Sequence, residues 1–170
     1  MINTLSLEES HELYRQTHNQ YPDYFQGFSL VSYIFEIGEL IQKSNIKTVI
    51  DYGCGKAKAW ETYQLKKLWG IERVDFYDPG VESFISRPLN PSDLLISIDV
   101  LEHVPEHLVD IVLDDMCRLS KKAMFVNVST RPASKKLIDG SNAHATVKPI
   151  SWWQHKIDRL DKLVISRFTS

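Results

Sequence analysis

The chain has 170 residues, a length that predicts one domain. It is 43% hydrophobic and 25% charged, which excludes a disordered or low-complexity protein and indicates a globular one. The net charge of −2 gives no basic excess for nucleic acid or an anionic membrane, although composition does not exclude a local basic patch.

Three features of the chain bear on its location. No apolar run approaches the length of a membrane span. The first residues are polar and acidic, unlike a secretory signal. Cys54 and Cys117 form no pattern of disulfides or metal ligands. We therefore expect a cytoplasmic protein that does not contact a membrane.

The first 46 residues are predicted to form a helical cap. A capping box at Ser6–Glu9 starts one helix, which runs to about Asn19 and is ended by Pro22. A second helix is predicted over residues 29–43, where apolar residues recur at helical spacing. Four aromatic residues precede it, and they form either a lid over a ligand or packing against the sheet: Tyr14, Tyr21, Tyr24 and Phe25.

Residues 47–60 combine a short strand, a glycine turn and the start of a helix. Thr48, Val49 and Ile50 are typical of a buried strand. Gly53 and Gly55 lack the Cβ atoms that would keep a ligand away from the backbone N–H groups of the turn. A single helix is predicted from about residue 57 to residue 69. The alternative is a tight turn that binds no ligand.

A second strand is predicted over residues 73–78, and it ends at Asp78-Pro79-Gly80. An acidic residue at this position of an α/β fold often binds ribose hydroxyls. Asp75, in mid-strand, is a competing candidate for that ribose-binding role. Alternatively, Asp78 only caps the turn before Pro79. Two prolines between residues 87 and 91 predict that a further strand is short or absent there.

The rest of the chain alternates strands and helices. A nearly continuous apolar run over residues 93–100 predicts a central parallel strand. A helix follows from about Pro105, and then a strand over residues 123–128. Residues 129–149 have weak periodicity, which is typical of a long loop that is either functional or disordered. A short helix and a strand over residues 162–169 complete the chain.

Three of these segments together resemble class I S-adenosylmethionine-dependent methyltransferases. They are Asp51-x-Gly53-x-Gly55, Asp78, and the Asp99–Val104 run DVLEHV. The third glycine of the family falls at Ala57. The resemblance implies a Rossmann-like α/β fold with a mostly parallel sheet, helices on both faces, an N-terminal cap and a short or absent third strand. The single domain divides into a cap (1–46), a cofactor-binding core (47–128) and an acceptor region (129–170).

The resemblance also implies the cofactor site. S-adenosylmethionine would lie across the strand ends, with its methionine part near the glycine turn and its ribose on Asp78. The cofactor-binding candidates are Asp51, Tyr52, Gly53, Cys54, Gly55, Asp78, Pro79, Asp99, Val100, Leu101 and Tyr24. The implied function is methyl transfer to a small-molecule or sugar-like acceptor.

The catalytic candidates are Glu102, His103 and His144, because each could take a proton from the acceptor. The alternative for Glu102 and His103 is a charged pair at a helix N-terminus. With Asp99, the same residues are similar to the metal site of some methyltransferases that modify RNA ends or quinone precursors. Asp99 and Val104 depart from that pattern, and we predict no metal.

Two further functions remain open from the sequence. The first is a non-catalytic binding module or partner subunit that keeps the fold. The second is a nicotinamide-dependent oxidoreductase, which the spacing of the glycines disfavours because position 58 is a lysine and not the third glycine of G-x-G-x-x-G.

Overall fold

The computed structural model describes residues 4–170, so residues 1–3 of the expected cap lie outside it. The strands are β1 (Thr48–Tyr52), β2 (Arg73–Tyr77), β3 (Ser92–Ile98), β4 (Ser120–Ser129) and β5 (Leu163–Thr169). The α-helices are α1 (Leu7–Gln20), α2 (Ile34–Lys43), α3 (Lys58–Thr62), α4 (Leu65–Leu68), α5 (Val109–Leu119) and α6 (Ile150–Asp158). Short 3₁₀ turns cover Ser29–Tyr33, Glu82–Phe84, Leu101–His103 and Glu106–Leu108.

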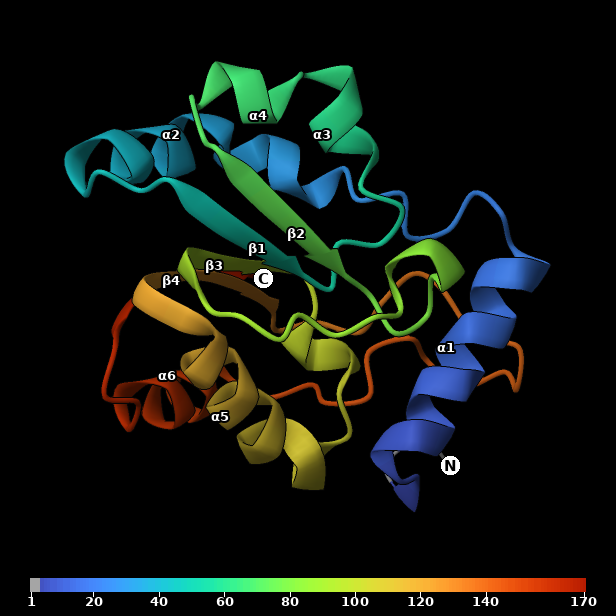
Figure 1. Ribbon diagram of the computed structural model, residues 1–170. Helices are drawn as coiled ribbons and strands as arrows, with labels where there is room; N and C mark the ends of the chain where they lie inside the picture. The colour runs from blue at the N-terminus through green and yellow to red at the C-terminus, as the bar shows by residue number, and fades with distance from the viewer. Residues whose placement is uncertain (1–3) are drawn as a thin grey trace.

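The five strands form one sheet in the order β2-β1-β3-β4-β5, and every neighbouring pair is parallel. Helices α2, α3 and α4 cover one face of the sheet, and α5 and α6 cover the other (Figure 1). This arrangement confirms the predicted α/β class with helices on both faces and is consistent with a Rossmann-like fold. The chain crosses from β2 past β1 to β3, so the strand order reverses between β1 and β3.

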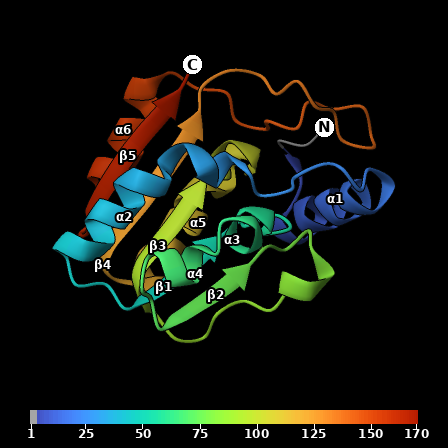
Figure 2. The same ribbon diagram turned by 90° about the horizontal axis from the view of Figure 1, so that it is seen from above.

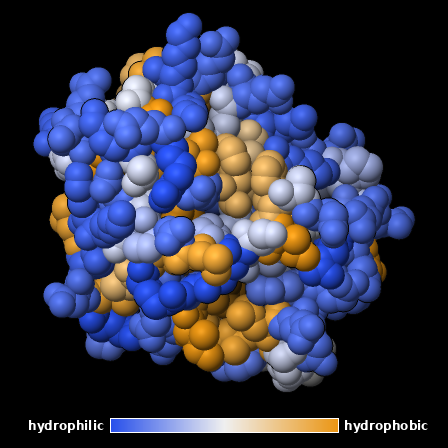
Figure 3. All heavy atoms as spheres, in the orientation of Figure 1, coloured by the Kyte–Doolittle hydropathy of each residue, from blue (hydrophilic) through white to orange (hydrophobic). Residues whose placement is uncertain are grey.

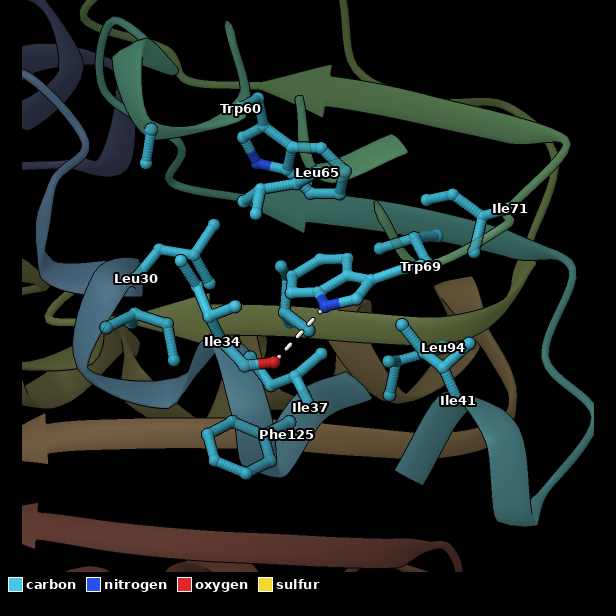
Figure 4. Close-up of a cluster of buried hydrophobic side chains, with 14 of the residues drawn as sticks. Leu30, Ile34, Ile37, Ile41, Trp60, Leu65, Trp69, Ile71, Leu94 and Phe125 are labelled. Carbon is cyan, nitrogen blue, oxygen red and sulfur yellow. Dashed lines mark hydrogen bonds between the residues drawn. The ribbon is translucent and has the colours of Figure 1, made fainter. Parts of the chain in front are cut away.

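Helices pack on both faces of the sheet, and successive side chains of a strand point to opposite faces. The apolar side chains of the strands therefore divide between two clusters, one on each face of the sheet. One cluster joins α2, α3 and α4 to the sheet, and the indole N–H of Trp69 donates to the Ile34 carbonyl within it, at 3.2 Å (Figure 4). The strand residues on that side are Val49, Leu94 and Phe125, and those on the other side are Ile50, Leu95 and Met124.

Within the described residues, no strand lies between β2 and β3 along the chain, and the only element there is the 3₁₀ turn Glu82–Phe84. Pro88 and Pro91 lack the N–H donors that a ladder requires. Arg87 instead forms an ion pair with Asp115 of α5 and holds this connection against that helix. The prediction of a short or absent third strand is confirmed.

The predicted N-terminal cap divides into two parts. Only α1 and the segment up to Gly27 lie at the carboxyl edge of the sheet, whereas α2 covers a face (Figure 2). The capping box at the start of α1 is present, with Ser6 and Glu9 bonded reciprocally. The face seen in Figure 3 is mostly hydrophilic, with small apolar patches between polar groups.

The prediction of a single helix over residues 57–69 is wrong, because the structure has two helices there, α3 and α4, separated at Gln64. Gln64 has a left-handed backbone with φ 48° and ψ 44°, and its side chain is exposed. The left-handed region costs an L-residue other than glycine roughly 1–2 kcal/mol. The helical pattern of the sequence did not reveal this break.

Replacing Gln64 with glycine is therefore expected to raise the free energy of unfolding by about 0.5–1 kcal/mol. Gln42→Gly is the matched control, because Gln42 is exposed within the regular helix α2. There the same substitution is expected to lower stability by about 0.5–1 kcal/mol. Urea unfolding measures the change in the free energy of unfolding for each variant. Two changes of the same sign would contradict the prediction.

Candidate functional site

A cavity of about 840 Å³ lies beside the carboxyl ends of β1, β2 and β3. Ligands of open α/β sheets bind outside these ends, at the point where the strand order reverses. Helix α1, residues 23–30 and the loop of residues 129–149 contribute most of the remaining walls. Eleven of the predicted site residues line the cavity: Asp51, Tyr52, Gly53, Cys54, Gly55, Asp78, Pro79, Asp99, Val100, His103 and His144.

The backbone N–H groups of the glycine turn are bonded within the chain. Every backbone N–H from Gly53 to Lys58 donates a hydrogen bond within the chain. The N–H of Lys56 donates to the Phe25 carbonyl and that of Lys58 to the Gln26 carbonyl, both at 3.0 Å. The expectation that a ligand meets free N–H groups here is therefore wrong, because two of them bond to residues 25 and 26 and the other four to Tyr77, Asp78 and Cys54.

The two glycines of the turn allow chain segments to approach one another. Gly53 has φ 79° and Gly55 has φ 55°, both in the left-handed region. A Cβ atom on Gly53 would collide with the side chain of Val100, and one on Gly55 with the backbone carbonyl of Phe25. The missing Cβ atoms thus make room for β3's end and for the N-terminal segment.

Two carboxyl groups lie behind this turn, the buried Asp51 and the half-buried Asp78. Asp51 accepts a hydrogen bond from the indole N–H of Trp60 at 2.6 Å, and burial raises its pKa to about 7. Asp78 accepts from the backbone N–H groups of Gly55 at 2.7 Å and Gly80 at 2.8 Å, and burial raises its pKa. Each oxygen of Asp78 keeps a second lone pair, so the residue both fixes the turn and can accept from a ligand hydroxyl.

Asp99 follows β3 in a left-handed conformation with φ 55°. The side-chain amide of Asn127 donates to its carboxylate. The other end of that amide accepts from the hydroxyl of Tyr33 at 2.8 Å and from that of Thr169 at 3.2 Å. This network orients Asp99 at the cavity wall. Sequence reasoning missed Asn127, whose signal was a polar amide inside an apolar strand.

His103 and His144 face each other with ring centroids 4.9 Å apart. Their Nδ1 atoms lie 2.7 Å from the Ala143 carbonyl and 2.6 Å from the Arg131 carbonyl. Because a carbonyl only accepts, each Nδ1 carries the proton and each Nε2 is the unprotonated acceptor. Burial lowers the pKa of His103 to about 3 and also lowers that of His144. Both rings are neutral and are weak bases.

Glu102 lies behind the cavity wall and does not line it. Its Oε1 accepts from the Ser129 N–H at 2.8 Å, and its buried Oε2 has no partner among the described residues. Burial and the neighbouring charge of Asp99 raise the pKa of Glu102 to about 8. The structure therefore does not support direct contact between Glu102 and a substrate.

Two of the predicted cofactor residues also lie elsewhere. Leu101 is fully buried in the apolar cluster under α5. Tyr24 stacks on Tyr21 with ring centroids 4.8 Å apart and does not line the cavity. Tyr14 and Phe25 of the predicted aromatic lid do line it.

The residues considered for a metal do not come together as a site. Within residues 4–170, no three side chains of the ligating types are arranged to hold a metal ion. Glu102 points to the end of β4, and the Nδ1 atoms of His103 and His144 already bind carbonyls. The geometry thus gives no support to the metal alternative.

Comparison of the chain with protein-family models, with curated proteins and with solved structures found no match. Among residues 4–170, no helix has the length and apolar character needed to cross a bilayer. The function must therefore be argued from the cavity and its residues.

Proposed function

We propose that this chain binds S-adenosylmethionine and transfers its methyl group to a small-molecule acceptor. One observation carries the proposal. The three segments that resemble the methyltransferase motifs follow three different strands, and residues of all three line one cavity. The volume of about 840 Å³ lies within the range of ligand pockets, roughly 300–1,000 Å³.

The residues of the cavity suit this cofactor. Its sulfonium and ammonium groups are positive and its ribose offers hydroxyl donors, so carboxylates are complementary to it. Asp99 presents a carboxylate with one oxygen bonded to Asn127. Asp78 retains lone pairs for ribose hydroxyls, and Asp51 lies close enough to Asp78 for the charge of one to raise the pKa of the other.

The cofactor supplies an activated methyl group, so the chain's task is to align the acceptor and exclude water. His103 and His144 offer unprotonated Nε2 atoms to a hydroxyl or amine of the acceptor. Because the pKa of His103 is about 3, this residue orients an acceptor better than it removes a proton. Helix α1 and the 129–149 loop close the acceptor side through an apolar contact of Leu13 and Tyr14 with Leu137 and Ala143.

The second candidate is a non-catalytic module with the same fold. It is favoured by the occupied N–H groups of the glycine turn, which residues 25–27 cover. A cofactor that needs those groups would have to displace this segment.

Calorimetric titration with S-adenosylmethionine, S-adenosylhomocysteine and NAD separates these possibilities. We expect both sulfur cofactors to bind and NAD not to bind. Binding of NAD alone would overturn the proposal, and binding of none of the three would favour the module.

Asp78→Asn is expected to weaken S-adenosylmethionine binding by about 1–3 kcal/mol, because a charge-assisted hydrogen bond to the ligand is lost. Asp75→Asn is the control, since Asp75 forms an ion pair with Arg73 at 3.0 Å and does not line the cavity. Circular dichroism of both variants checks that the fold is kept, because Asp78 also holds Gly55 and Gly80. Equal affinities of the two variants would show that Asp78 does not contact the cofactor.

A further inference from the structure

We propose that the acceptor carries a carboxylate or phosphate group, which Arg131 and Lys135 of the loop after β4 bind in the cavity. This inference rests on the proposed function and names the substrate class of the same site. The two residues belong to the loop that leaves β4, whereas the glycine turn and Asp78 lie at the β1 and β2 side of the same edge (Figure 2).

Arg131 is unlike the other arginines of the chain. Its guanidinium has no carboxylate partner among residues 4–170, and it lines the cavity. The other six each form an ion pair with an aspartate or glutamate: Arg15, Arg73, Arg87, Arg118, Arg159 and Arg167. A guanidinium is a planar fork of donors that matches a carboxylate or phosphate in two hydrogen bonds. An unpaired arginine in a cavity wall is thus available to such a group.

Lys135 is the second cation of this wall. Its Nζ lies 5.0 Å from the ring centroids of both Tyr24 and Phe25, and it has no carboxylate partner among the described residues. The same Phe25 ring has its centroid 4.9 Å from that of His18 and 5.6 Å from that of His103, so the ammonium lies beside the same group of rings. Burial lowers the pKa of Lys135 itself. An anion would restore the interactions that the ammonium loses on burial.

His18 is an independent sign that the cavity binds a polar ligand. The residue is only 7% exposed and lines the same cavity. Its buried Nδ1 has no hydrogen-bond partner within residues 4–170. Buried polar atoms of proteins are almost always bonded, so a polar group of a ligand is the natural partner. Gly80 lies close to the other side of this ring, which fixes its position.

The carboxylates of the cavity belong to other segments than Arg131 and Lys135. Asp51 and Asp78 follow β1 and β2, and Asp99 is bonded to Asn127. The fourth carboxylate of the lining, Asp23, is exposed and forms no ion pair with either cation. The cavity thus offers the carboxylates that follow β1, β2 and β3 to the cationic cofactor, and Arg131 with Lys135 to an anionic acceptor.

The test uses the full chain saturated with S-adenosylhomocysteine and titrated with inorganic phosphate, and separately with acetate, at constant ionic strength. Backbone amide NMR signals of residues 129–145 report binding. We expect these signals to shift, and we expect Arg131→Gln and Lys135→Gln each to weaken phosphate or acetate binding roughly tenfold. Lys136→Gln is the matched control, because this neighbouring lysine is exposed and does not line the cavity.

The affinity for S-adenosylmethionine is measured on the same four proteins, so that the two proposals fail separately. Unchanged cofactor affinity with loss of anion binding supports the inference. A tenfold loss of cofactor affinity in Arg131→Gln would instead place the methionine carboxylate on Arg131 and overturn it. Absence of both phosphate and acetate binding also overturns it, whether or not the cofactor binds. If only acetate or only phosphate binds, the acceptor carries that group.

Discussion

Replacing Gly55 with alanine is expected to lower the free energy of unfolding by about 2–4 kcal/mol. Two costs add at this position. The backbone has φ 55°, which strains any L-residue with a side chain, and the new Cβ would collide with the Phe25 carbonyl. Because that carbonyl accepts from the Lys56 N–H, moving it also breaks a hydrogen bond. Chemical unfolding in urea measures the loss.

Gly70→Ala isolates the first of these costs. Gly70 has φ 64°, but a Cβ atom there meets nothing within 4 Å. Its replacement is expected to cost about 1 kcal/mol from backbone strain alone. The difference between the two variants is therefore the cost of displacing the N-terminal segment from the turn. Equal losses would show that residues 25–27 do not rest on the turn.

The sequence predicted the elements that depend on local patterns. Alternating strands and helices, the missing third strand and the end of β2 just before Asp78 follow from apolar periodicity and from proline and glycine positions. The resemblance to methyltransferases implied one site for Gly53, Asp78 and Asp99, and all three line a common cavity because parallel strands end at one edge of a sheet.

The features that the sequence did not predict depend on contacts between distant segments. Nothing near Gly55 indicates that the Phe25 carbonyl lies against it. The DVLEHV run placed Glu102 beside His103, but in a 3₁₀ turn adjacent side chains point in different directions. His103 faces the cavity, while Glu102 turns toward Ser129 and accepts from its N–H. Arg131 and Lys135 were overlooked because a loop without periodicity gives no signal for the direction of its side chains.

Glu102 is expected to make the protein less stable as the pH rises. Burial raises its pKa from the ordinary 4.5 to about 8, so between these values the folded chain holds a proton that the unfolded chain has released. Stability must then fall as the pH rises through that window. We expect the loss due to Glu102 to be on the order of 2–4 kcal/mol between about pH 5 and pH 8.5. Asp51, with its pKa raised to about 7, adds a loss of the same sign.

Glu102→Gln isolates the titration of Glu102 from that of Asp51. Glutamine resembles the protonated carboxyl group and keeps an oxygen for the Ser129 N–H, so the variant should match the natural chain near pH 5 and exceed its stability near pH 8.5. Glu102→Leu removes that oxygen and should cost about 1–3 kcal/mol at every pH, because a buried N–H loses its acceptor. Urea unfolding of the three proteins across this range measures both effects. Parallel profiles for the natural chain and Glu102→Gln would mean that Glu102 is ionised in the folded protein, and its role at the end of β4 would then be that of a charged acceptor.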